Sequence, residues 1–106
     1  MISQETIQKI NTFTEERDWD QFHSPENLAK SICIEAAELL ECYQWGERPD
    51  PEAVREELAD VLNYCVQLCE KLGLDMDEIL LSKLEKNAEK YPVEKARGKN
   101  TKYTDL

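Results

Sequence analysis

Two pairs of carboxylates are spaced three residues apart in this sequence, and each pair lies in a segment whose apolar residues repeat with helical spacing. The first pair is Glu35 and Glu38, and the second is Glu57 and Asp60. Residues three apart share one face of a helix, so each pair would present two carboxylates side by side. If the two helices faced each other, the four carboxylates would form an oxygen-rich site of the kind that Mg²⁺ or Mn²⁺ prefers.

Glu35 has unusual surroundings for a carboxylate. On a helix it would share a face with the apolar residues Leu28, Ile32 and Leu39. A carboxylate on an apolar face must be neutral, paired with a cation or bound to a metal, because an unpaired buried charge is costly. No lysine or arginine of the same predicted helix lies on this face. The position of Glu35 therefore favours a metal site.

Two other interpretations of the acidic pairs stay open at this point. Asp and Glu make up 23 of the 106 residues, so a pair three residues apart also arises by chance and is typical of a solvated helix face. A di-iron carboxylate bundle is the second alternative, but it uses two Glu-x-x-His pairs. This chain has one histidine, His23, and it lies in a predicted loop.

Helix start and stop signals divide the chain into four segments. A capping residue followed by proline opens two of them, at Ser24-Pro25 and Asp50-Pro51, and Gly46 and Gly73 close the same two. The predicted helices cover residues 3–17, 24–46, 50–73 and 75–90, and the polar remainder, 93–106, is predicted to be extended. The fold expected from these pieces is all-α, an antiparallel four-helix bundle in a single domain over residues 1–106.

Charge and length restrict the partners of such a domain. The net charge of −10 argues against binding to duplex nucleic acid, which requires a basic face. Residues 83–102 are locally basic and are a candidate phosphate contact, although a solvated helix end explains them equally well. A chain of 106 residues buries a modest share of its surface, so self-association is expected.

The cysteines and the hydropathy pattern indicate the compartment. The four cysteines have no zinc-binding spacing and are typical of reduced, buried thiols. No apolar run is long enough to span a bilayer, and no signal sequence is recognisable. We therefore expect a cytoplasmic protein without a membrane partner.

The acidic pairs and the residues around them resemble the MazG-like all-α nucleotide pyrophosphohydrolases, most closely the branch of dCTP pyrophosphatases. The ERDWDQFH block makes the resemblance to this branch specific. The matching blocks follow one another in order over nearly the whole chain: ERDWDQFH at 16–23, PxNL at 25–28, ELxE at 38–41, QW at 44–45, EELxDVLxY at 56–64, SK at 82–83 with Asn87, YP at 91–92 and KYT at 102–104, where x marks a position outside the pattern.

The resemblance implies hydrolysis of a deoxynucleoside triphosphate, dCTP or a modified dCTP, to the monophosphate and pyrophosphate. It implies that Glu35, Glu38, Glu57 and Asp60 hold Mg²⁺, with Mn²⁺ as a possible substitute. It also implies a homo-oligomer, a dimer or a pair of dimers, in which neighbouring chains share sites. Hydrolysis of a different nucleotide, or a helical oligomerisation module without catalysis, are the alternatives.

The resemblance further implies which side chains contact the substrate. In the family pattern as it applies here, four residues line the base pocket and two residues one turn apart on the last helix reach the phosphates or sugar. These are Trp19, His23, Trp45 and Tyr64 for the base, and Lys83 and Asn87 for the phosphates or sugar. Ile10 departs from the pattern, because animal members carry a histidine there, and this leaves the base preference open.

Overall fold

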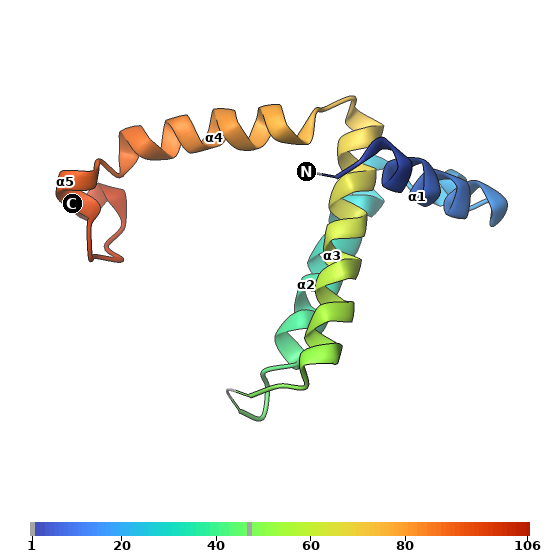
Figure 1. The fold of residues 1–106 in the computed structure, drawn as a ribbon, viewed down its shortest axis with the longest axis horizontal. Helices are drawn as coiled ribbons and strands as arrows, with labels where there is room; N and C mark the ends of the chain where they lie inside the picture. The colour runs from blue at the N-terminus through green and yellow to red at the C-terminus, as the bar shows by residue number, and fades with distance from the viewer. Residues whose placement is uncertain (1, 47) are drawn as a thin grey trace. The chain divides into compact units, whose positions relative to one another are not determined.

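The computed structural model describes residues 2–46 and 48–106, and every regular element among them is helical, as predicted (Figure 1). The chain forms two compact units, Met1–Leu74 and Asp75–Leu106. The first unit contains α1 (Gln4–Glu16), η1 (Asp20–Phe22), α2 (Pro25–Glu41) and α3 (Pro51–Leu72). The second contains α4 (Met76–Lys90), α5 (Val93–Ala96) and η2 (Tyr103–Asp105).

The predicted capping residues begin the helices that carry the carboxylates. The Ser24 hydroxyl accepts a hydrogen bond from the Asn27 backbone N–H, and the Asp50 carboxylate accepts one from the Glu52 N–H, both at 3.2 Å. Gly73 ends α3 in the left-handed conformation, with φ 65°. These bonds satisfy backbone groups that a helix end would otherwise leave unpaired, which explains why the boundaries follow the sequence signals.

The end of α2 differs from the prediction. The helix ends at Glu41 and not at Gly46, and residues 42–45 form turns. In these turns the backbone N–H groups of Cys42 and Tyr43 donate to the carbonyls three residues earlier, at 3.1 and 3.0 Å. This tighter spacing closes the helix one turn early.

Within the first unit, α2 packs along α3, and α1 also contacts α3 (Figure 1). Leu28 on α2 and Val66 on α3 are the fully buried apolar residues of the described chain, at 0% and 2% exposure. Other large apolar side chains of these helices stay exposed, among them Leu40, at 71%, and Leu62. The first unit therefore covers little of its own apolar surface.

The C-terminal segment, predicted to be extended, instead contains α5 and η2. The Pro92 carbonyl accepts hydrogen bonds from the N–H groups of Lys95 and Ala96, which forms the single turn of α5. The Tyr103 ring packs edge-on against the Tyr91 ring, with centroids 5.9 Å apart, a separation typical of favourable aromatic pairs. These local contacts fold the segment back on the end of α4, and the prediction of an extended tail was wrong there.

Among residues 2–46 and 48–106, no helix combines the length and apolar content that a membrane span needs.

Candidate metal and nucleotide site

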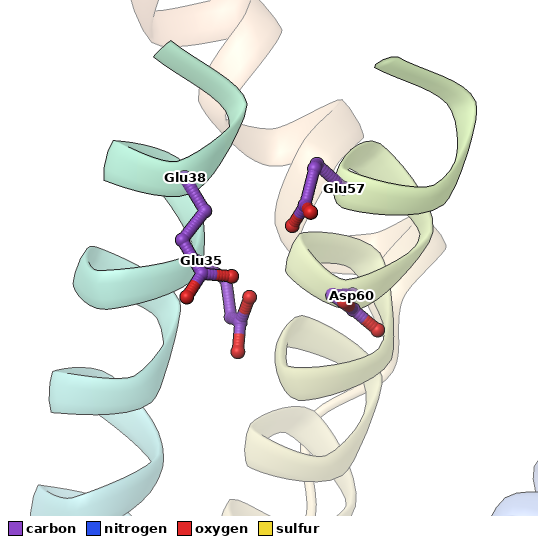
Figure 2. A group of neighbouring side chains, drawn as sticks. All are labelled: Glu35, Glu38, Glu57 and Asp60. Atoms are coloured by element: carbon purple, nitrogen blue, oxygen red, sulfur yellow. The ribbon is translucent and has the colours of Figure 1, made fainter. Parts of the chain in front are cut away.

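The four carboxylates predicted from their spacing come together between α2 and α3. Glu35 and Glu38 project from α2, and Glu57 and Asp60 project from α3 (Figure 2). One carboxylate oxygen of each residue lies within 4.8 Å of those of the other three. Glu35 and Glu57 are half-buried, whereas Glu38 and Asp60 are exposed. We call these four residues the acidic cluster.

Crowding perturbs the protonation of the acidic cluster. The pKa of Glu35 is raised to about 7, and the largest cause is a hydrogen bond with Glu38, which a protonated Glu35 can donate. Burial and the charges of Glu38, Asp60 and Glu57 are the further causes of this raised pKa. Burial is the main cause that raises the pKa of Glu57, followed by its contact with Glu38. Negative charge at such close range is unfavourable without a counter-charge.

The acidic cluster has the donor atoms that a divalent cation requires. The Oε2 atoms of Glu35 and Glu57 are buried and have no hydrogen-bond partner among the described residues. Buried oxygens without a partner are rare in folded proteins, and a bound ion is one way in which they are satisfied. Four carboxylates on two helices match the preference of Mg²⁺ for hard oxygen ligands. The residues present therefore fit a bound Mg²⁺ or Mn²⁺.

A cavity of about 520 Å³ adjoins the acidic cluster, and Asp60 belongs to both. Three of the residues predicted to bind the base line this cavity: Trp19, His23 and Tyr64. Ile10, the residue that departs from the family pattern, also lines it. The structure therefore brings the acidic cluster and an aromatic cavity together within the first unit.

The loop that carries Trp19 and His23 is held by several contacts. Asp18 adopts a left-handed conformation, φ 54°, and its backbone and side-chain oxygens both accept from the Gln21 side-chain amide at 3.0 Å. Lys71 on α3 donates to Asp20 at 2.7 Å, and this contact lowers the pKa of Asp20. The Gln21 hydrogen bonds hold the loop together, and the Lys71 contact attaches it to α3.

Aromatic contacts orient the side chains of this loop inside the cavity. The Trp19 ring lies edge-on to Phe13, with centroids 5.8 Å apart, and the His23 ring lies edge-on to Tyr64 at 6.2 Å. Both arrangements are typical of favourable aromatic pairs. His23 Nδ1 is buried and has no hydrogen-bond partner in the described part of the chain. It is therefore available to a ligand in the cavity.

Tyr64 connects the cavity with the acidic cluster. Burial raises the pKa of its phenol, and the negative charges of Glu35, Asp60 and Glu38 raise it further. The hydroxyl consequently stays protonated at neutral pH and is a hydrogen-bond donor there.

The remaining predicted contacts are not among the residues that line this cavity. Trp45 lies in the turns after α2, is 90% exposed and does not line the cavity. Its predicted place in the base pocket is therefore not formed within the first unit. Lys83 and Asn87 lie on α4 in the second unit, where Lys83 is exposed and Asn87 is half-buried.

Several residues of the cavity were not predicted. Thr14, Asn63 and Gln67 line it, and Thr14 and Gln67 are the two buried polar residues of the described chain. The signal for the α3 residues was present, because Asn63 and Gln67 follow Asp60 by three and seven positions and so continue its helix face. Thr14 had no such signal.

The protein is all-α, and its acidic cluster lies between two antiparallel helices beside an aromatic cavity (Figures 1 and 2). The cluster is suited to a cation, and the cavity is suited to a planar ligand. Residues 30–106 match the MazG-like family, and the chain belongs to this family.

Named relatives are consistent with this membership. The chain is 39% identical to mouse dCTP pyrophosphatase 1 and 40% identical to the human protein of that name, over 96% of its own length. It spans about two thirds, 66%, of the length of each. The crystal structure of a pyrophosphatase from Archaeoglobus fulgidus is similar at a TM-score of 0.75 and 41% identity, covering 83% of this chain and 90% of the other.

Proposed function

We propose that this chain is a divalent-metal-dependent pyrophosphohydrolase that converts a deoxynucleoside triphosphate, dCTP or a modified dCTP, to the monophosphate and pyrophosphate. The observation that carries the proposal is the acidic cluster, in which four carboxylates with oxygens within 4.8 Å adjoin a cavity large enough for a base. Membership of the MazG-like family and the names of the relatives support it.

Mg²⁺ is the cation that we assign to the acidic cluster, with Mn²⁺ as a substitute. Bound there, it would neutralise phosphate charge and lower the pKa of a water molecule. The carboxylates of Glu35, Glu38, Glu57 and Asp60 are the catalytic residues in this proposal, because they hold the cation against the phosphates. The half-buried position of Glu35 and Glu57 excludes part of the solvent and strengthens these interactions.

The cavity receives the base in this proposal. Trp19 and Tyr64 offer aromatic faces, and stacking of a base on such a face contributes about 1–3 kcal/mol. His23 has a buried nitrogen free to hydrogen-bond with the base or sugar. Lys83 and Asn87 on α4 are assigned to the phosphates or sugar on the basis of the family pattern.

We further propose a homo-oligomer whose second copy covers the exposed apolar residues of α2 and α3. Ile34, Leu40, Leu58 and Leu62 are 44–71% exposed, and a second copy presents the same surface in return. Trp45 would then complete the base pocket of the neighbouring chain. Light scattering of the purified protein should give a dimer or tetramer, and a monomer at micromolar concentration would contradict this arrangement.

The remaining expectations concern the organisation and location of the protein. The antiparallel four-helix bundle in a single domain over residues 1–106 stays a prediction. A cytoplasmic location also stays a prediction. The four cysteines are free, but none is buried as predicted, because Cys33 is exposed and the other three are half-buried.

The decisive experiment is pyrophosphate release from each of the four dNTPs and from 5-substituted dCTPs, with Mg²⁺ and then with EDTA. Cation-dependent release from dCTP supports the proposal. Cation-dependent release from another nucleotide would keep the reaction and change the substrate, an outcome that the apolar Ile10 in the cavity makes worth testing. No release from any nucleotide would favour a non-catalytic helical module.

Glu35→Gln tests the role of the acidic cluster directly. It removes one charge at nearly constant volume, and we expect hydrolysis to fall by a factor of at least about 100 with the fold retained. Glu89→Gln on α4, an exposed carboxylate outside the acidic cluster, is the matched control and should keep full activity. Normal turnover by the Glu35 variant would refute the metal assignment.

A further inference from the structure

Two side-chain amides on α3 form a pair inside the cavity. Gln67 Nε2 donates a hydrogen bond to Asn63 Oδ1 at 3.2 Å, one helical turn away. Both residues line the cavity, and Gln67 is only 9% exposed. We call Asn63 and Gln67 the amide pair.

The hydrogen bond within the amide pair leaves the Gln67 oxygen and the Asn63 NH₂ group without a side-chain partner, while Gln67 Nε2 and Asn63 Oδ1 keep one further hydrogen and one further lone pair. Each carboxamide has one oxygen that accepts and one NH₂ group that donates. The mutual bond occupies Gln67 Nε2 and Asn63 Oδ1, and no other side-chain hydrogen bond of either residue occurs in residues 2–46 and 48–106. The Gln67 oxygen is thus an acceptor, and the Asn63 nitrogen is a donor. Neither atom is among the buried side-chain atoms that lack a partner, so both are accessible to a ligand in the cavity.

The other residues of the cavity leave the amide pair as a candidate to form hydrogen bonds with polar atoms of a ligand. On the α1 side, Ile10 and Phe13 are apolar, and the polar lining residues already have partners. The Thr14 hydroxyl donates to the Ile10 carbonyl at 3.0 Å, Thr6 is hydrogen-bonded to Ser3, and Lys9 is paired with Glu5. These residues can pack against a ring but offer it few hydrogen bonds. The amide pair supplies an acceptor and a donor together from α3.

The position of the amide pair along α3 suits the base of a nucleotide whose phosphates lie at the acidic cluster. A helix rises about 1.5 Å per residue, so Asn63 lies about 4.5 Å and Gln67 about 10.5 Å along the axis from Asp60. Trp19 and Tyr64 line the same cavity and can stack on the ring. The amide pair would then lie at the edge of the stacked base.

We propose that the amide pair selects bases that carry an exocyclic amine next to an unprotonated ring nitrogen. The Gln67 oxygen would accept from the amine, and the Asn63 amide would donate to the ring nitrogen. Cytosine presents this order at N4 and N3, whereas uracil and thymine present the reverse, a carbonyl and an N–H. Enzymes commonly read a base through this edge. The inference rests on the proposed function and adds the residues that set its base preference.

Comparison of dCTP with dUTP tests the proposal, because the two differ only at these two positions of the ring. Two well-oriented hydrogen bonds discriminate between bases by about 5- to 150-fold. We expect kcat/KM of the wild-type protein to favour dCTP by a factor in this range. Gln67→Met and Asn63→Leu, which keep size and remove polarity, should each lower the ratio, because each removes one of the two hydrogen bonds that discriminate between the bases.

Controls separate base selection from folding. Gln8→Met changes an exposed amide on α1 outside the cavity, and it should leave the ratio and the rates unchanged. A ratio that stays at the wild-type value in both cavity variants, while both rates fall equally, would show a purely structural amide pair. A wild-type preference for dUTP would also overturn the proposal. If one cavity variant does not fold, the other decides.

Binding of the monophosphates tests base selection by the amide pair separately from the proposed hydrolysis. Calorimetry with dCMP and dUMP measures base selection without hydrolysis. If the wild-type protein hydrolyses no nucleotide but binds dCMP more tightly than dUMP, and Gln67→Met reduces the difference, the proposed reaction fails and the amide pair retains its role. Equal binding of dCMP and dUMP by the wild-type protein would refute base selection by the amide pair.

Discussion

Replacement of Glu35 by glutamine should stabilise the metal-free protein at alkaline pH while it abolishes metal binding. In the folded protein the pKa of Glu35 is raised to about 7 from its usual 4.5. The folded state therefore binds this proton more tightly than the unfolded chain does. The free energy of unfolding falls as the pH rises from 4.5 to about 7, and the loss is complete above that range. The glutamine side chain does not ionise, so the free energy of unfolding of the variant does not fall in this way as the pH rises.

The size of the effect follows from the two pKa values. Their difference corresponds to at most about 3 kcal/mol at pH 8. Glu35 is half-buried and the acidic cluster is open to solvent through Glu38 and Asp60, and screening reduces the expected gain to about 1–2 kcal/mol. For a domain of this size, that gain raises Tm by roughly 5–10 °C.

The assay is thermal unfolding in EDTA at pH 5 and pH 8, at one fixed protein concentration because association also affects Tm. The variant should melt above the wild-type protein at pH 8 and close to it at pH 5. Glu89→Gln, outside the acidic cluster, should show no such pH-dependent difference. A variant that is less stable than the wild-type protein at pH 8, or a gain of equal size at both pH values, would refute the argument from charge repulsion.

Three further predictions concern the cation, the core and the loop. Mg²⁺ at 100 times its Kd should raise the free energy of unfolding of the wild-type protein by about 2.7 kcal/mol, measured by denaturant titration, and should act far less on Glu35→Gln. Leu28→Ala removes a side chain with 0% exposure and should lower the same free energy by about 2–5 kcal/mol. Lys71→Met removes the 2.7 Å contact with Asp20 that holds the loop, and steady-state kinetics should show KM for dCTP raised about two- to fivefold with kcat nearly unchanged.

Each of these three predictions can be contradicted by a specific result. Equal stabilisation of both proteins by Mg²⁺ would place the cation outside the acidic cluster. A cost below about 1 kcal/mol for Leu28→Ala would mean that the surrounding helices close the space left by the side chain. A fall in kcat without a change in KM for Lys71→Met would show that the loop contact serves the reaction step and not substrate binding.

The sequence by itself determined the helices and the chemistry of the acidic cluster. Caps such as Ser24 and Asp50 act through hydrogen bonds to backbone groups two or three residues away, so their effect is local and readable from the order of residues. The spacing of Glu35 and Glu38 placed both on one helix face for the same reason. The sequence signals were weaker at the end of α2 and in the C-terminal segment. At the first, a tight turn ends the helix early, and in the second, single turns and an aromatic contact replace extended chain. Both were therefore mispredicted.

The tertiary structure decided which residues meet. Helix spacing does not say that Glu57 and Asp60 face α2, nor that the loop of Trp19 and His23 is attached to α3 through Lys71, 51 residues from its partner Asp20. It also decided that the cavity excludes Trp45 within one chain and includes Gln67, whose burial was not readable from its polar side chain. These contacts depend on how α1, α2 and α3 pack, and packing is set by the fit of many side chains at once, which no short stretch of sequence contains.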